Sequence, residues 1–352
     1  MESFGSWSIL TTNFITVLFL CLGGVLLPAI LHLLDGEWRY QIRHYSCAFV
    51  SLLPVAFVLL LVLLFNGEMT FQWLAKENTH GYSTIEWLLD GNIDHWNHYG
   101  LLVARQIVGF IVIALLSYRF VRLQKVLDHS NSYVDVRRYR NSAISILFAY
   151  VLYGTMIAWD FEMTMAEEWH SAIYGAYHFV SNFHAFLALF VIVLFFFKGS
   201  KNLRPFDDKV FNSLAQLLLG FTILWVYFFF SQYIIMWYVR FPSEINRFHD
   251  MMYGGFGNLW WTFFTFKVVI PFIFLAIITP FRHKPILTTS IAIFIVIGTW
   301  IERYTWIAGS VDTEFYHQPM TAPFDILVTF IVVAISWFTL SKGIKKCALV
   351  QK

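Results

Sequence analysis

The sequence is poor in charge. Only 13% of its 352 residues are Asp, Glu, Lys or Arg, whereas 58% are hydrophobic and 20% are aromatic. A water-soluble domain of this length and composition would expose far more apolar surface than folded proteins tolerate. The shortage of charge therefore excludes a soluble globular protein and predicts a chain that spans a lipid bilayer.

Cysteine is also scarce, and the pattern argues against metal and haem centres. The three cysteines, Cys21, Cys47 and Cys347, are scattered and form no C-x-x-C pair, which leaves an iron–sulfur site unsupported. His170 and His184 are spaced for one helix face, but two stacked haems need a second helix with a matching pair. We therefore expect no haem, iron–sulfur or metal centre in this chain. The net charge of +2 gives no reason to expect nucleic acid as a partner.

Long apolar runs are abundant, and about twenty apolar residues are enough to cross the hydrocarbon core. They predict an all-α, polytopic transmembrane helix bundle with about nine spans, within a range of eight to ten. The predicted spans cover residues 8–33, 44–65, 98–118, 141–159, 170–197, 210–238, 256–280, 286–307 and 322–341.

Basic residues orient this bundle. Eighteen Lys and Arg fall in segments on one side of the predicted membrane, and only four, Lys76, Arg240, Arg247 and Arg303, fall on the other side. Because cytoplasmic segments are rich in Lys and Arg, we expect the N-terminus outside and the C-terminus in the cytoplasm.

Nothing in the sequence divides the chain into separate domains. No Gly/Ser linker or low-complexity tract is present, so residues 1–352 are predicted to form a single integral membrane domain. The outside loop at 66–97 is long and acidic, and its aromatic residues favour a short interfacial helix.

Several ionisable and polar residues fall within the predicted spans, where each charge costs roughly 2.5–3.5 kcal/mol on insertion scales. Lys267 is close to mid-membrane and Arg105 is shallower, so we expect an internal counter-ion for each. The remaining candidates lie in the outer third of their spans: Asp160, Gln232, Glu302 and Asp325. Asp160 and Glu302 are either functional intramembrane acids or interfacial anchors in water, and the sequence does not pair any acid with a base.

The fifth span carries a polar stripe. Its members recur at helical spacings of three and four, so they share one face, which we expect to point into the bundle. They are His170, Tyr174, Tyr177, His178, Ser181 and Asn182. The stripe either fixes packing through interhelical hydrogen bonds or forms a proton relay or the wall of a polar ligand pocket.

Four blocks of the sequence give it a family resemblance. They are "LHLLDGEWRYQIRHY" (31–45), "WDFEMTMAEEWHSAIYGAY" (159–177), "FFFSQYIIMWYVRFPSEI" (228–245) and "GTWIERYTWIAG" (298–309). With these blocks the chain resembles the NrfD-like, polysulfide-reductase-type membrane subunits, and it is most similar to the ActF-type subunit of alternative complex III, with the ActC type as the sister possibility. The family motif positions fall on Asp160, Trp169, Gln232 and Glu302. The sequence departs from the family in two ways. His170 replaces the aromatic residue that usually follows Trp169, and nine spans are predicted where the family has ten.

The resemblance implies a non-autonomous part of an enzyme. It implies a membrane subunit of a quinol:electron-acceptor oxidoreductase, of cytochrome c type, in a respiratory chain of the bacterial inner membrane. Its partners would be a homologous NrfD-like membrane subunit, an iron–sulfur subunit and multihaem cytochrome c subunits. The chain would contribute quinone contact, a periplasmic proton pathway, or both. Of the candidates for these roles, the resemblance carries over Asp160, Gln232 and Glu302, and their positions in the predicted spans add the others: His170, His178, Asn182, Lys267, Arg105 and Asp325.

Two other functions are compatible with the same residues. A proton-coupled secondary transporter would also use intramembrane acids, although such folds commonly show inverted repeats, which the sequence lacks. A scaffold subunit that binds no quinone would use the same polar groups for packing.

Overall fold

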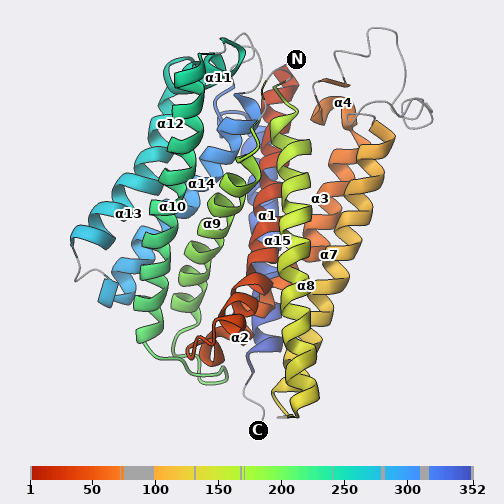
Figure 1. The fold of residues 1–352 in the computed structure, drawn as a ribbon, viewed down its shortest axis with the longest axis vertical. Coiled ribbons are helices and arrows are strands. Elements are labelled where there is room, and N and C mark those ends of the chain that lie inside the picture. Colours follow the sequence, from red (N-terminus) through yellow and green to blue (C-terminus); the bar gives the residue numbers. More distant parts are fainter. Residues whose placement is uncertain are drawn as a thin grey trace.

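The computed structural model describes residues 2–71, 73–74, 99–130, 132–166, 169, 171–240, 242–278, 282–309 and 317–349. Within these residues the chain is helical, without strands, and nine helices are long and apolar enough to cross a membrane. The predicted all-α polytopic bundle is confirmed. The two ends of the chain lie at opposite ends of the bundle (Figure 1), as an odd number of spans requires.

The nine spans are longer than the sequence predicts at several ends. They run over Phe4–Leu33, Arg39–Phe65, Tyr99–Leu127, Tyr133–Met163, Tyr174–Phe197, Lys209–Val239, Gly257–Ile277, Pro285–Ala308 and Pro323–Cys347. The third span extends beyond residue 118 and the fourth begins before residue 141, so basic residues assigned to their connecting loop lie on helices instead. This happens because long basic side chains at helix ends can reach the interface without ending the helix.

Helix α1 (Glu2–Leu33) lies at the centre of the bundle (Figure 1). It packs against α8 (Tyr133–Ala158), α9 (Tyr174–Phe197) and α14 (Pro285–Ala308), and against the second span. The second span consists of α2 (Arg39–Cys47), η1 (Ala48–Leu52) and α3 (Leu53–Phe65). A side chain at Gly23 or Gly24 would collide with Phe186 of α9 or Phe49 of η1, so these glycines permit the close packing of α1.

The remaining spans surround this centre. Helix α7 (Tyr99–Leu127) pairs with α8, α10 (Lys209–Val239) pairs with α9, and α15 (Pro323–Cys347) packs on η1 and α1. Two short helices, α4 (Gly67–Thr70) and α11 (Pro242–Tyr253), lie at the end of the bundle that carries the N-terminus (Figure 1). The predicted interfacial helix of the 66–97 loop falls almost entirely outside the described residues.

Two spans contain π-helical turns. The fourth span ends in η3 (Trp159–Met163). The seventh comprises α12 (Gly257–Phe264), η4 (Thr265–Val269), α13 (Ile270–Phe272) and η5 (Ile273–Ile277). Pro271 has no N–H to donate to the carbonyl of residue 267, so the regular α pattern is interrupted at η4. Single π turns are common at functional sites because they redirect side chains, and here they carry Asp160, Glu162 and Lys267.

Candidate functional site

A network of four charged side chains crosses the interior of the bundle. Lys267 Nζ forms an ion pair with Glu302 and donates to Ser181 Oγ at 2.6 Å. Arg303 donates to both carboxylates: Nη2 lies 2.7 Å from Glu302 Oε1, and Nη1 lies 2.7 Å from Glu162 Oε2. All four charged side chains are fully buried. We call Lys267, Glu302, Arg303 and Glu162 the buried charge network.

The network contains two acids and two bases, so it is neutral as a whole. Neutrality matters because removing a charge from water costs several kcal/mol per ion unless a partner and hydrogen bonds compensate. Glu302 is well compensated, because Ser181 Oγ and Trp225 Nε1 donate to it at 2.8 and 2.9 Å and Tyr177 donates as well. A change of charge at any one member would leave a net charge buried in the bilayer.

The π-helical turns bring the members together. In η3, Glu162 turns inward and receives hydrogen bonds from Tyr174 and Arg303. In η4, Lys267 meets α14 at Gly298, where an added Cβ would lie 3.0 Å from Phe266 Cβ and 3.3 Å from the Lys267 backbone nitrogen. Gly298 therefore allows the close approach of these two helices that puts Lys267 beside Glu302.

His178 continues the network at the Glu162 end. Its Nε2 lies 3.5 Å from Glu162 Oε1, its ring meets Phe19 edge-on with centroids 4.7 Å apart, and the side chain is fully buried. Among the described residues neither ring nitrogen of His178 has a hydrogen-bond partner, so its contact with Glu162 is an ion-pair distance only. A neutral imidazole can donate from one nitrogen and accept at the other, so His178 can face the carboxylate while offering an acceptor elsewhere.

Arg247 covers the network from outside the spans. It lies on α11, and its guanidinium carbon is 4.3 and 5.1 Å from the ring centroids of Trp169 and Trp306. Nη2 donates to the backbone carbonyls of Glu162 and Trp306, each at 3.3 Å. Burial lowers the pKa of Arg247 to about 10, so the group is still protonated at neutral pH. The positively charged guanidinium of Arg247 thus covers the Glu162 end of the buried charge network.

A cavity of about 200 Å³ lies between α8 and α9 and reaches His178. Its inner walls include the rings of Phe19, Tyr150 and Phe179, and its space exists partly because Gly154 has no side chain. Val151 also lines it; this residue lies in the middle of the fourth span and is 59% exposed. Since exposure at that depth means exposure to lipid, the cavity opens sideways into the membrane.

A second, larger groove lies between α1, α14 and α15. It has a volume of about 530 Å³, is almost wholly apolar, and is bordered by Asn13 and Trp300, whose side chains hydrogen-bond to each other at 2.9 Å. It does not include a charged residue or His178. This groove therefore suits lipid chains better than proton-transfer chemistry.

Asp160 belongs to a separate pair. Its carboxylate receives two hydrogen bonds from Arg105 of α7, one of them from Nε at 2.8 Å, and another from Gln106 Nε2 at 2.5 Å. Asp160 is fully buried, as is Glu302, so the alternative in which these acids are interfacial anchors in water is wrong. The expected counter-ions also exist: Arg105 pairs with Asp160 and Lys267 with Glu302.

The other candidates from the sequence are dispersed. Asn182 is buried and donates to the backbone carbonyl of His178 at 2.9 Å, whereas Gln232 accepts from Ser171 at 3.2 Å. Asp325 begins α15 and pairs with His317 at 2.6 Å, away from the buried charge network. His170 lies outside the described residues. Tyr174, Tyr177, His178, Ser181 and Asn182 are buried as predicted for the polar stripe.

Sequence reasoning missed three members of this site. Arg303 and Arg247 were assigned to outside segments, and Glu162 was not among the candidates, but all three side chains are buried. The assignment of Arg303 to an outside segment is thus wrong, because it lies within the span Pro285–Ala308. Arg247 does lie outside the spans, on α11, but its side chain is buried. The sequence did carry a signal for the burial of Arg303, because this residue follows Glu302 directly within a predicted span. The burial of Glu162 depends on the π turn, which has no clear sequence signature.

The described residues contain no group of three or more His, Cys, Asp or Glu side chains placed to hold a metal ion. Profiles of known protein families give no match to this chain, and a search of curated proteins gives none either. What can be said of its activity therefore rests on the geometry above and on the resemblance of the four sequence blocks.

Proposed function

We propose that this chain is a membrane subunit of a quinol:electron-acceptor oxidoreductase complex in a bacterial respiratory chain, and that it contributes a quinol contact and a proton path. We place the complex in the bacterial cytoplasmic membrane as part of this proposal. It also includes a homologous membrane subunit and the iron–sulfur and multihaem cytochrome c subunits as partners. The four resembling sequence blocks support this class of complex.

One observation carries the proposal: His178 lines a cavity that opens to lipid and also adjoins the buried charge network. A quinol is dissolved in the membrane and reaches its site from the side, through apolar surroundings. Its oxidation releases two protons, which need acceptors where the ring binds. The flat cavity walls of Phe19, Tyr150 and Phe179 suit an aromatic headgroup.

The chemistry assigned to this chain is proton transfer. A quinol hydroxyl donates a hydrogen bond to the imidazole of His178, which takes the proton as the ring is oxidised to the quinone. The carboxylate of Glu162, 3.5 Å away, stabilises the imidazolium that forms. The two electrons pass to the iron–sulfur or haem centres of the partner subunits. Protonation gives the otherwise neutral network a charge of +1, which favours release of that proton before the next one arrives.

The proposal is tested by purifying the native complex in mild detergent and measuring quinol oxidation with decylubiquinol or menadiol. His178→Gln should reduce turnover per assembled complex by about 10²-fold or more, since a positioned proton acceptor typically contributes 10²–10⁴-fold. His184→Gln is the matched control: His184 lies on the same helix, is equally buried, and lies 3.3 Å from Thr222 Oγ1, without the ion-pair contact that His178 makes with Glu162. Its turnover should stay near normal.

The same preparation separates the competing functions. A chain that emerges without redox subunits and shows no quinol-dependent activity contradicts the proposal and favours a transporter. A complex that oxidises quinol equally well with His178→Gln and His184→Gln favours a scaffold role for this subunit.

A further inference from the structure

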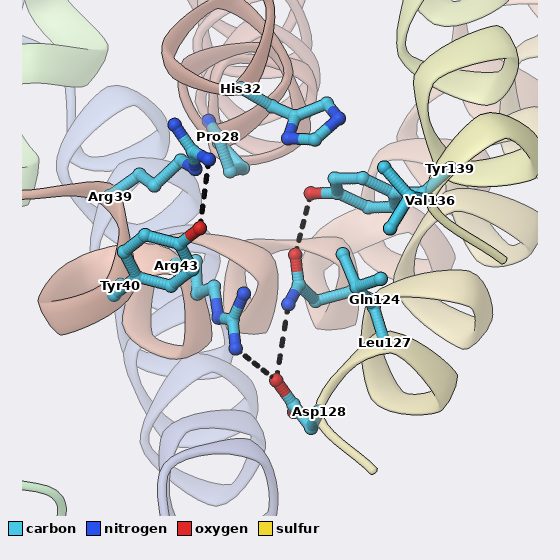
Figure 2. A pocket seen from close by; sticks show the side chains of 10 residues that line it. All are labelled: Pro28, His32, Arg39, Tyr40, Arg43, Gln124, Leu127, Asp128, Val136 and Tyr139. Atoms are coloured by element: carbon cyan, nitrogen blue, oxygen red, sulfur yellow. Dashed lines mark hydrogen bonds and ion pairs between the residues drawn. The ribbon is translucent and has the colours of Figure 1, made fainter. Parts of the chain in front are cut away.

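A polar cavity lies at the end of the bundle opposite the N-terminus, far along the spans from the buried charge network. It has a volume of about 260 Å³. It is enclosed by the last turn of α1, the first turns of α2, the end of α7 and the start of α8. Figure 2 shows its lining: Pro28, His32, Arg39, Tyr40, Arg43, Gln124, Leu127, Asp128, Val136 and Tyr139.

The cavity has an excess of positive charge. Arg43 forms an ion pair with Asp128, which neutralises one of its two guanidinium groups. Among the described residues the acidic partner of Arg39 is Asp35, at 3.6 Å, and that carboxylate is 90% exposed, so solvent screens the interaction. The lining residues therefore carry a net charge of +1 with His32 neutral.

The donors in the cavity face a shared space. In Figure 2, Arg39, Arg43 and Tyr40 project from α2 on one side, and Tyr139 and Gln124 project from the other. Arg39 Nη2 donates to Tyr40 Oη at 2.9 Å, and the Tyr139 hydroxyl and the Gln124 amide form a hydrogen bond of 2.5 Å.

His32 adds a further group without a fixed partner. It points into the cavity against the edge of Tyr139, with ring centroids 4.6 Å apart (Figure 2). Among the described residues its ring nitrogens make no hydrogen bond. The cavity thus combines a weakly paired guanidinium with an imidazole that makes no hydrogen bond to the described residues, and both groups can donate to a phosphate oxygen.

The surroundings are apolar on the lipid side. Leu127 and Val136 line the cavity itself, and Leu34 and Val126, which are close in sequence to the lining residues His32 and Leu127, are 73% and 41% exposed. A free phosphate would gain nothing from these side chains, whereas a phospholipid would lay its acyl chains on them. Basic pockets between helices at the end of a bundle are typical sites for anionic headgroups.

We propose that this cavity binds the phosphate group of an anionic phospholipid, with Arg39 and His32 as its donors and Arg43 held in place by Asp128. The site is independent of the quinol proposal, because it shares no residue with the buried charge network or the α8–α9 cavity.

The test uses the purified full chain in nanodiscs that contain phosphatidylglycerol and phosphatidylcholine with identical acyl chains, and it measures retained lipid by native mass spectrometry. The wild-type protein should retain phosphatidylglycerol in preference to phosphatidylcholine. Arg39→Gln should reduce that preference about five- to tenfold, as expected for one basic contact at the membrane surface. Arg138→Gln is the matched control, since Arg138 lies at the same end of the bundle but its side chain is 66% exposed.

Equal losses in Arg39→Gln and Arg138→Gln would overturn the proposal, because they would indicate general attraction to a basic surface. A wild-type protein without preference for phosphatidylglycerol would overturn it without any variant. Inorganic phosphate is the third arm: if it binds at millimolar concentration while neither lipid is retained, the lipid assignment is wrong.

Discussion

Arg303 and Glu162 lie 141 positions apart in the sequence and meet in the middle of the protein, with Nη1 2.7 Å from Oε2 and neither side chain exposed. This contact joins the end of the fourth span to the eighth. Through it, the Lys267–Glu302 pair and His178 become parts of one neutral network. Because the network is neutral, its opposite charges can offset the cost of removing each of them from water.

The first prediction concerns this balance. Lys267→Met leaves the network with a net negative charge, and Glu302→Gln leaves it with a net positive charge. Breaking a buried pair by removing one partner costs about 3–5 kcal/mol, so each single variant should lower the thermal stability and yield of the purified chain. The double variant Lys267→Met/Glu302→Gln restores neutrality and should be more stable than either single variant. A double variant whose loss equals the sum of the two single losses would contradict the pairing.

The second prediction concerns Asp160. Because Arg105 and Gln106 both donate to its carboxylate, the geometry favours a structural role over the proton-accepting role that the sequence resemblance implies. Asp160→Asn should therefore lower the amount of assembled complex, while turnover per assembled complex stays within a few-fold of normal. Quantifying subunits and turnover in the same preparation separates the two. Normal assembly with a loss of turnover of a hundredfold or more would restore the proton-accepting role.

The third prediction concerns orientation. Most basic residues lie at the end of the bundle that holds the C-terminus. At the other end there are few, and two of these, Arg247 and Arg303, have buried side chains. A reporter fused after residue 352 should thus read as cytoplasmic, and a reporter inserted in the 66–97 loop should read as external. The opposite pair of results would place the proposed proton path on the cytoplasmic side.

Much of the fold could be predicted from the sequence, because apolar runs of about twenty residues specify spans by length and hydropathy alone. The inward orientation of the polar stripe followed from helical periodicity in the same way. The pairings did not follow, since Lys267 contacts Glu302 and Arg105 contacts Asp160 across sequence separations that local patterns do not encode.

The cavity beside His178 could not be predicted either. It is a space left between two helices where Gly154 lacks a side chain, and it depends on the relative placement of α8, α9 and Phe19. A sequence shows a glycine in a span, but it does not show whether the missing side chain is replaced by a neighbour or leaves a void. The structure decides this, because a Cβ at Gly154 would come no closer than 3.4 Å to any neighbour, the nearest being the Phe19 ring.

If quinol reaches His178 through the α8–α9 cavity, filling that cavity should block its binding. Gly154→Leu places a side chain in the space without a backbone clash, whereas Gly220→Leu adds the same side chain to α10, where nothing lies within 4 Å of the new Cβ. The measurement is the Kd of decylubiquinol for the purified protein, followed by quenching of its tryptophan fluorescence. We expect a Kd at least about tenfold higher for Gly154→Leu, or about 1.4 kcal/mol of lost binding free energy, and an unchanged Kd for Gly220→Leu. Equal Kd values for Gly154→Leu and the wild-type protein would contradict it.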